Sequence, residues 1–392
     1  ACGVKRFAWN WALAEWDTQY KAGNKPTANK LKKHWNSIKK AQFPWVYKSP
    51  KGANQQPFGD LGEAFNNFFA GKSKRPKFKN KGYRDSFYVE NDKFWFTDDG
   101  WHIHIPKIGN IRIREQLRFT AIILSATVSK HGDRFFASIH VDVGENYSRP
   151  RKSNYTTGAD LGIKALATLP KEKIRAPKPL KKNLKRLRRL SKALSRKKKG
   201  SSNRFKAKRK LANFHRRITN IRLDALHKLT TRLCRENQLV TIENLNVKGM
   251  LRNHKLARAI ADIGFGTFKE QMLYKYQIFD SIIVLADTFY PSTKGCDACN
   301  HVNKHMTLAD RTFVCENCGH TEDRDTHAAN RLHTLGLREL TEFLSGLDKA
   351  CGPKSSGYHH KMLIPKRMTR EMMTKLCRDE TGTKPCSQMN TN

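Results

Sequence analysis

Acidic residues are scarce in this sequence. Only 34 Asp and Glu stand against 76 Lys and Arg among 392 residues, which gives a formal net charge of +42. Such an excess of positive charge does not stabilise a fold, because like charges repel one another in a compact chain. A large polyanionic partner is the simplest explanation, and nucleic acid is the first candidate. An anionic membrane surface and simple solubility are the alternatives.

Long apolar runs and a disulfide framework are also lacking. No stretch approaches the about 18 consecutive apolar residues of a membrane span, and no signal segment opens the sequence. Four of the nine cysteines form two CxxC pairs and five are scattered, which suits a metal site in a reducing compartment. We therefore expect an intracellular protein with no membrane partner.

The apolar pattern divides the chain into segments of different kinds. Residues 1–82 have apolar and aromatic residues at helical spacing, and we expect these to form a core rather than to stack on bases. Residues 83–143 consist of short β-type runs between turn residues, typical of a small β-barrel or sandwich. The tail after residue 345 lacks steady periodicity, and we expect it to be disordered.

Two basic helices are predicted after residue 170. Residues 171–220 contain 22 Lys and Arg and one acid, Glu172. Apolar stripes follow one face of each helix, at Leu180, Leu184, Leu187 and Leu194, and then at Leu211, Phe214, Ile218, Ile221 and Ala225. A helix that is apolar on one side and cationic on the other is typical of docking on protein while contacting phosphates, although a solvated charged face is the alternative. The candidate nucleic-acid contacts are Lys185, Arg188, Arg189, Arg196, Lys197, Lys198, Lys199, Arg204, Lys208 and Arg209.

Two CxxC motifs predict a zinc ribbon. Cys296 and Cys299 are separated by 15 residues from Cys315 and Cys318, and four thiolates complete a tetrahedral shell. Such a site leaves no open position for water, so a structural Zn²⁺ is expected and a redox motif is the weaker alternative. Gly319 suits the tight turn of the second pair, because glycine tolerates a positive φ.

Three acids stand in unusual places. Asp160 and Glu243 follow or end strand-like runs, and Asp325 opens a helix after the cysteine motifs. A carboxylate at the end of a buried strand is costly unless it is paired or metal-bound. If the three converge, a pair of Mg²⁺ ions would remove their repulsion and support phosphodiester hydrolysis. Each acid has an alternative role as a helix cap or a surface acid.

Several motifs together resemble the TnpB family of transposon-encoded, RNA-guided nucleases, which is related to type V CRISPR effectors. Residues 158–163 (GADLGI), 240–250 (VTIENLNVKGM) and 323–330 (DRDTHAAN) look like the three RuvC motifs of that family. Residues 76–79, 105–109, 196–201, 265–268 and 290–294 fit as well, so the resemblance covers about residues 1–345.

The resemblance implies an α+β multidomain fold. It implies a helical recognition domain at 1–82, a wedge-like β-barrel at 83–150 and an RNase H-like RuvC domain at 151–290 and 321–345. The zinc ribbon would be inserted at 291–320 and the tail would be 346–392. Asp160, Glu243 and Asp325 would be the catalytic, magnesium-binding acids. Asp323 would support these acids without binding the metal itself.

The resemblance further implies an endonuclease that cuts double-stranded DNA, with a guide RNA from the transposon end pairing with the target beside a short motif. The protein would act as a monomer with one RNA, in a prokaryotic cytoplasm on the nucleoid. Two departures stand out: the family has a strand before the segment matching 1–7, and most often Asn at the position of His327. A nuclease-silent RNA-guided repressor and a DNA transposase are the rival interpretations.

Overall fold

The computed structural model describes the chain except for residues 83–84, 119–120, 145–146, 148, 150–152, 154, 304, 308–309, 349–360, 366–367 and 369–392. The chain divides into two compact units, one of residues 1–145 and 197–216 and the other of residues 146–196 and 217–392. The sheets and clusters given below are those of the described residues. None of the helices in that part of the chain is long and apolar enough to cross a membrane.

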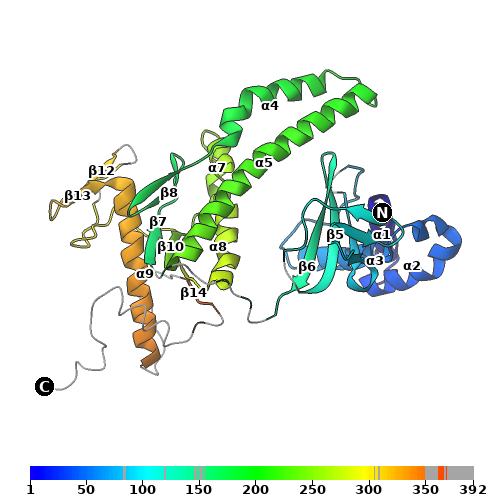
Figure 1. Cartoon of the computed structure of the whole chain (residues 1–392), viewed down its shortest axis with the longest axis horizontal. Coiled ribbons are helices and arrows are strands. Elements are labelled where there is room, and N and C mark those ends of the chain that lie inside the picture. The colour runs from blue at the N-terminus through cyan, green and yellow to red at the C-terminus, as the bar shows by residue number, and fades with distance from the viewer. Residues whose placement is uncertain are drawn as a thin grey trace. The chain divides into compact units, whose positions relative to one another are not determined.

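Helices make up the first part of the first unit (Figure 1). They are α1 (Cys2–Lys21), α2 (Ala28–Gln42), the short 3-10 helix η1 (Pro44–Lys48) and α3 (Lys51–Phe69). Thr27 caps α2, since its hydroxyl accepts a hydrogen bond from the Lys30 N–H at 3.3 Å. The aromatic residues expected in the core are indeed buried: Trp35, Phe58 and Phe65 are at most 2% exposed.

Two antiparallel sheets complete this unit. One has the order β1 (Ser86–Glu90), β5 (Ile122–His131), β6 (Arg134–Asp142). The other joins β2 (Trp95–Phe96), β3 (His102–Ile105) and β4 (Gly109–Arg112), with the 3-10 helix η2 (Asn91–Lys93) before it. Backbone ladders do not join the two sheets within the described residues, so the expected closed barrel stays a prediction.

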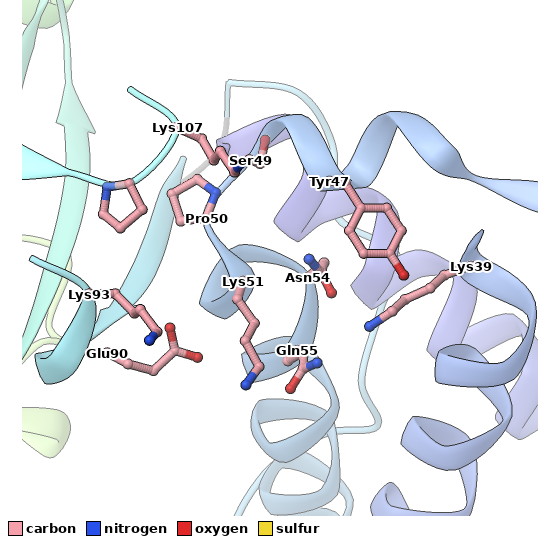
Figure 2. A pocket seen from close by; sticks show the side chains of 11 residues that line it. Lys39, Tyr47, Ser49, Pro50, Lys51, Asn54, Gln55, Glu90, Lys93 and Lys107 are labelled. Atoms are coloured by element: carbon pink, nitrogen blue, oxygen red, sulfur yellow. The ribbon is translucent and has the colours of Figure 1, made fainter. Parts of the chain in front are cut away.

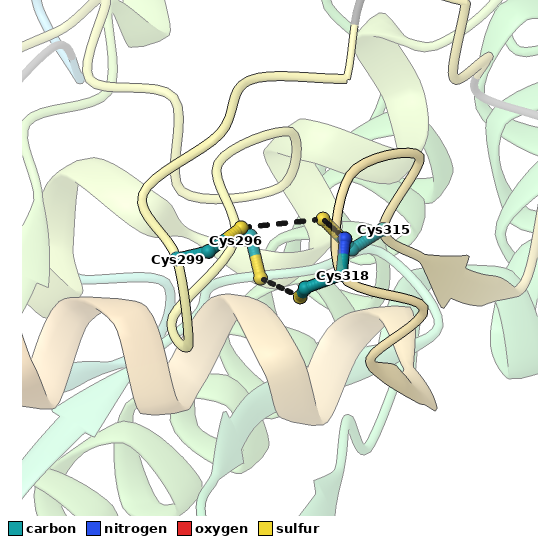
Figure 3. Close-up of side chains that lie close together, drawn as sticks. All are labelled: Cys296, Cys299, Cys315 and Cys318. Carbon is teal, nitrogen blue, oxygen red and sulfur yellow. Dashed lines mark hydrogen bonds between the residues drawn. The ribbon is translucent and has the colours of Figure 1, made fainter.

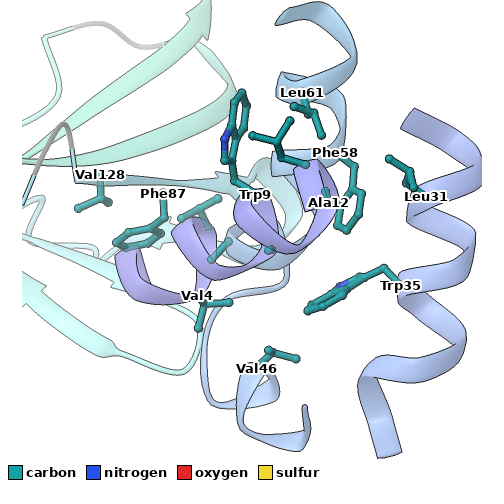
Figure 4. Close-up of a cluster of buried hydrophobic side chains, with 14 of the residues drawn as sticks. Val4, Trp9, Ala12, Leu31, Trp35, Val46, Phe58, Leu61, Phe87 and Val128 are labelled. Carbon is teal, nitrogen blue, oxygen red and sulfur yellow. The ribbon is translucent and has the colours of Figure 1, made fainter. Parts of the chain in front are cut away.

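The helices and strands of the first unit share one hydrophobic core. Val4 and Trp9 of α1 belong to the same buried cluster as Trp35 of α2 and as Phe87 and Val128 of the strands (Figure 4). The segments 1–82 and 83–150, which were expected as separate domains, thus contribute to one core, and their division into domains stays a prediction. Apolar side chains from both segments are needed to fill one interior.

A mixed sheet organises the second unit. Its order is β14 (Lys361–Leu363), β11 (Ile282–Ala286), β10 (Asn237–Glu243), β7 (Tyr155–Ala159). The three strands β7, β10 and β11 are parallel, and β14 runs antiparallel to β11. A hairpin of β8 (Ala165–Leu169) and β9 (Glu172–Arg175) follows β7. The expectation of a disordered tail is wrong for residues 361–363, because they pair with the sheet edge.

Helices cover both faces of this sheet. On β10, Val240 and Ile242 pack with α5 (Ser202–Glu236) and α8 (Phe265–Phe279), whereas Leu239 packs with Leu340 of α9 (Arg324–Asp348). The short helices α6 (Val247–Met250) and α7 (Ala257–Ile263) lead from β10 to α8. This arrangement, with the α+β composition of the chain, confirms the expected fold class at the coarse level.

The two predicted basic helices are present as α4 (Pro179–Ser195) and α5. On α5, Phe214 and Ile218 are buried at 5% and 4% exposure, but Ile221 is 38% exposed. The expected apolar stripe is therefore wrong at Ile221. The buried side of α5 continues instead through Leu226, Leu229 and Leu233, which pack in the core of the second unit.

Candidate active site and metal centre

The parallel sheet brings two of the three acids to one edge. Ile242 of β10 pairs with Ala159 of β7, so Glu243 and Asp160, the next residues along each strand, lie at neighbouring carboxyl ends. Asp160 is held there by a backbone bridge to β8, with hydrogen bonds of 3.0 and 2.8 Å exchanged with Thr168. Carboxyl ends of parallel strands are the usual place for a binding site in such a sheet.

The third acid comes from α9, which approaches the sheet very closely. A methyl group at Gly158 of β7 would meet the Ala329 carbonyl and, at 2.5 Å, the His333 backbone nitrogen. A Cβ at Gly336 would likewise meet the Thr241 hydroxyl of β10. Only glycine allows this contact, and it lets the first turn of α9, which carries Asp325, lie beside the edge formed by β7 and β10.

The three acids influence one another electrostatically. Burial, followed by the charges of Glu243 and Asp325, raises the pKa of Asp160 to about 8. Burial also raises the pKa of Glu243, whereas a hydrogen bond from Ser292 opposes that rise. The three carboxylates thus lie near enough for the charges of Glu243 and Asp325 to act on Asp160, although they are not among the described groups whose ligand atoms all lie within 4.8 Å of one another. A set of oxygen ligands with this repulsion fits divalent cations such as Mg²⁺, which would draw the acids together.

Neighbouring side chains orient the acids. The Ser292 hydroxyl donates to Glu243 Oε1 at 2.9 Å, and the Arg324 guanidinium lies 3.2 Å from Asp325 Oδ1. Asp323 has a different role from Asp325: its Oδ1 accepts from the Thr326 N–H at 3.0 Å and from Lys173 Nζ at 2.6 Å. Asp323 therefore caps α9 and ties it to β9, and its predicted supporting role at the acids stays a prediction.

Four cysteine sulfurs converge in the loops before α9. The Sγ atoms of Cys296 and Cys318 are 3.6 Å apart, and those of Cys299 and Cys315 are 3.5 Å apart (Figure 3). All four Sγ atoms lie within 4.8 Å of one another. Tetrahedral Zn²⁺ with Zn–S bonds of about 2.3 Å needs sulfurs about 3.8 Å apart. The four residues predicted as ligands therefore fit a zinc ion.

The two cysteine loops have the same construction. Asn300 and Gly319, each four residues after the first cysteine of its pair, have φ of +58° and +69°, and each donates its N–H to the carbonyl of that cysteine. The positive φ expected at Gly319 is confirmed. Hydrogen bonding from the backbone of His301, with help from Asn317, lowers the pKa of Cys299 to about 6. Hydrogen bonding from the backbone of His320 to Cys318 is outweighed by the other three sulfurs, which raise the pKa of Cys318 to about 12.

The candidate nucleic-acid contacts are mostly exposed. Lys185, Arg188, Arg189, Arg196, Lys197, Lys198, Lys199, Lys208 and Arg209 all have exposed side chains. Arg204 differs, because it is half-buried and its guanidinium donates to the Lys197 carbonyl at 3.0 Å. Arg204 therefore closes the turn between α4 and α5, and the other nine are free to face a partner's phosphates.

A cationic cavity in the first unit was not expected from the sequence. It has a volume of about 340 Å³ and is lined by four lysines, Lys39, Lys51, Lys93 and Lys107, and by one acid, Glu90, together with Tyr47 and Asn54 (Figure 2). Asn54 is 3% exposed, and its Oδ1 finds no hydrogen-bond partner among the residues that the structure describes. Burial and the neighbouring lysines Lys51 and Lys32 lower the pKa of Lys39. The cavity can therefore take an anion and offers an amide to a further ligand.

No single motif in the sequence signals this cavity. Its lysines come from α2, α3, η2 and the turn before β4, and they meet only when the helices and strands share their core. Ser292 was likewise noticed only within the segment before the cysteines, and its contact with Glu243 depends on the fold.

Family models match three parts of the chain. Residues 138–254 match a model described as "Probable transposase", residues 265–332 a "Cas12f1-like, TNB domain", and residues 1–25 a "Helix-turn-helix domain". Asp160 and Glu243 fall in the first of these matches, and Asp325 and the four cysteines fall in the second. In the structure, residues 1–25 contain one helix, α1, and the turn that follows it.

Two bacterial relatives match most of the chain. A "Putative RNA-guided DNA endonuclease" of Streptomyces pristinaespiralis is 37% identical over 288 residues, which cover 72% of this chain and 71% of the relative. The "Putative RNA-guided DNA endonuclease InsQ" of Escherichia coli K12 is 32% identical over 356 residues, or 85% of this chain and 87% of the relative.

A solved structure has a similar fold. A chain of the "Cryo-EM structure of the Cas12f1-sgRNA-target DNA complex" superimposes with a TM-score of 0.52 over 84% of this chain and 80% of that chain. The sequence identity is 12%, so the likeness concerns the fold alone.

Proposed function

Since the chain belongs to the TnpB family, we propose that it is an RNA-guided DNA endonuclease that cuts both strands of double-stranded DNA at one RuvC-type site. The observation that supports the proposal is that Asp160, at the end of β7, is buried and feels the charges of Glu243 of β10 and Asp325 of α9, which together raise its pKa to about 8. Acids held together against their mutual repulsion are typical of a site that binds cations.

In this proposal the three acids hold two magnesium ions. When bound, such a pair supplies an activated water and stabilises the leaving oxygen of a phosphodiester. Ser292 keeps one oxygen of Glu243 directed by its 2.9 Å hydrogen bond, so that the other oxygen is available to a ligand. The α9 cap by Asp323 fixes the first helical turn and with it Asp325.

The cysteine cluster holds one structural Zn²⁺. Its four thiolates leave no position for water, and the two cysteine loops connect the sheet to the start of α9. The exposed lysines and arginines of α4, α5 and the turn between them contact one guide RNA from the transposon end, bound by one chain. The expected place of action is bacterial nucleoid DNA.

The lysine cavity is a candidate for contact with the short DNA motif beside the target. Lysine ammonium groups suit phosphates, and an amide such as that of Asn54 suits a base edge. Guide pairing would read the remaining target sequence, as in other RNA-guided nucleases.

Cleavage by variants of the purified protein–RNA complex tests the chemistry. RNA that copurifies is sequenced, and a plasmid library carrying its target beside randomised flanks is the substrate. Asp160→Ala should lower the cleavage rate about 100-fold or more, because loss of one outer partner of a metal ligand already costs 10- to 100-fold. Asp224→Ala, which removes an exposed acid paired with Lys228, is the control and should cut normally. Full cleavage by Asp160→Ala with RNA bound would remove this acid from the mechanism.

A DNA transposase is the second candidate, because residues 138–254 match a model described as "Probable transposase". The two functions differ in their need for RNA. Removal of the copurified RNA by ribonuclease should abolish cleavage by a guided nuclease, whereas a transposase would still join DNA ends.

A further inference from the structure

Three further side chains of metal-binding type converge beside the cysteine cluster. They are His320, next to the glycine of the second cysteine loop, Glu322 of β13 (Thr321–Asp323), and His327 in the first turn of α9. One ligand atom from each lies within 4.8 Å of the others. Neither the four-cysteine shell nor the carboxylate site uses them.

The hydrogen bonds of His327 leave one ring nitrogen facing a carboxylate. Its Nε2 lies 2.7 Å from the Gly295 carbonyl oxygen, which can only accept, so Nε2 must carry a hydrogen. In the neutral ring, Nδ1 then presents a lone pair to Glu322 Oε2 at 3.2 Å. Two acceptors at this distance repel one another unless a proton or a metal ion lies between them. The His327 side chain is 0% exposed, so water does not screen that repulsion.

The surroundings are those of metal ligands. A histidine that binds a metal usually donates its other N–H to a carbonyl or carboxylate, as His327 does to Gly295. Asn330 Nδ2 donates to Glu322 Oε1 at 2.7 Å, which directs Oε2 toward the histidines. His320 Nε2 lies 3.7 Å from that same Oε2. The side chains of His320 and Glu322 are 37% and 24% exposed, which leaves a side open for a water ligand.

We propose that His320, Glu322 and His327 bind a second Zn²⁺, separate from the four-cysteine site. Two imidazoles and a carboxylate form a known zinc ligand set, whereas Mg²⁺ and Ca²⁺ prefer oxygen ligands. The ion would join β13 and its hairpin partner β12 (Thr312–Val314) to the first turn of α9, two residues from Asp325. His327 also stacks on Phe313 of β12, with ring centroids 3.7 Å apart, so the hairpin is already packed on this turn.

Zinc content of the full chain tests the proposal. The purified protein is loaded with zinc, desalted and measured for metal per chain. Two zinc ions per chain are expected for the wild type, and one for His320→Ala and for Glu322→Gln. His305→Ala is the control, because His305 is an exposed ribbon histidine that belongs neither to this cluster nor to the cysteine cluster. It should retain two ions.

Cobalt substitution shows whether each variant is folded. Co²⁺ bound by four thiolates has an intense sulfur-to-metal charge-transfer band, which should persist in His320→Ala and Glu322→Gln. The weaker bands of a cobalt ion with nitrogen and oxygen ligands should disappear in these two variants. One zinc per chain in the wild type would mean that a proton bridges His327 and Glu322, and the proposal would fail. Two zinc ions in both variants would mean that the second ion binds adventitiously elsewhere, which would equally overturn the proposal.

Discussion

At Asp160, the requirements of folding and of metal binding oppose each other. Burial, and then the charges of Glu243 and Asp325, raises its pKa to about 8. An acid whose pKa is higher in the folded than in the unfolded chain binds a proton more tightly when folded. Folding stability therefore falls as pH rises from the unfolded pKa, near 4, toward 8. Bound Mg²⁺ would reverse this trend, because it stabilises the ionised acid.

Asp160→Asn should consequently stabilise the magnesium-free protein while it abolishes cleavage. The amide keeps the shape of the carboxyl group and removes its charge. At pH 8 we expect a melting temperature higher by at least about 2 °C, since 1 kcal/mol corresponds to about 2–4 °C for a domain of this size. The difference should shrink toward pH 4, and added Mg²⁺ should raise the melting temperature of the wild type only. Thermal melts across this pH range measure the difference. Equal melting temperatures for variant and wild type at pH 8 would contradict the interpretation that the charge of Asp160 destabilises the magnesium-free fold.

Candidate site residues could be predicted where the sequence immediately around them carries a signal, such as a fixed spacing or a preceding strand. The CxxC spacing predicted the four cysteines whose sulfurs lie together in the structure, and the position of acids at strand ends singled out Asp160 and Glu243. Partners that depend on the fold could not be predicted. Asp323 meets Lys173 from a strand 150 residues away, and Asn54 is buried, with an Oδ1 that has no partner among the described residues, only because α3 packs on the strands of its unit.

The position of α9 depends on a glycine in the strand beneath it. A side chain at Gly158 would collide with the backbone of α9 at Ala329 and His333, and backbone atoms cannot rotate away as a side chain can. Extra volume at such a contact costs about 1–3 kcal/mol. The helix would have to move, and Asp325 would move with it.

Gly158→Ala should therefore lower both stability and cleavage. We expect about 1–3 kcal/mol less free energy of unfolding, measured in urea, and a slower cut even at temperatures where the variant is folded. Gly266→Ala is the matched control, because a methyl there meets nothing within 4 Å and replaces a helical glycine of α8. That change should be neutral or stabilising by up to about 1 kcal/mol. Equal stability and equal cleavage for the two variants would show that close approach by α9 is unnecessary.

Element types followed from hydrophobic periodicity, whereas pairing did not. The run 239–242 (LVTI), rich in β-branched residues, predicted a strand, and β10 is buried on both faces. The strand β14 has three residues, too few for a periodic signal, and it is defined by its ladder to β11. At Ile221 the periodicity predicted burial where there is none. Helical spacing from Phe214 and Ile218 places Ile221 on the buried face, but α5 buries a different face from Leu226 onward.

For the whole molecule, charge is the dominant property. A formal charge of +42 favours any polyanion, so binding alone does not indicate which cations contact the RNA. The salt dependence of RNA binding does indicate which cations contact phosphates. Each phosphate contact releases a counterion and makes the affinity fall more steeply with salt by a known amount. Lysines that face solvent without contacting phosphate change the net charge but leave this slope nearly unaltered.

The triple change of Lys197, Lys198 and Lys199 to Gln should flatten the salt dependence of RNA binding. These residues are exposed in the turn between α4 and α5. If each contacts a phosphate, the slope of log K against log salt should decrease by about 0.7–0.9 per residue, or about 2–3 in total. Arg118→Gln removes an exposed cation that lies 2.8 Å from Glu115, and because this charge is already neutralised the slope should stay the same. Filter binding of the copurified RNA between about 50 and 300 mM salt gives both values. An unchanged slope in the triple variant would place the guide RNA elsewhere on the chain, and a flat response in the wild type would contradict a phosphate-dominated interface altogether.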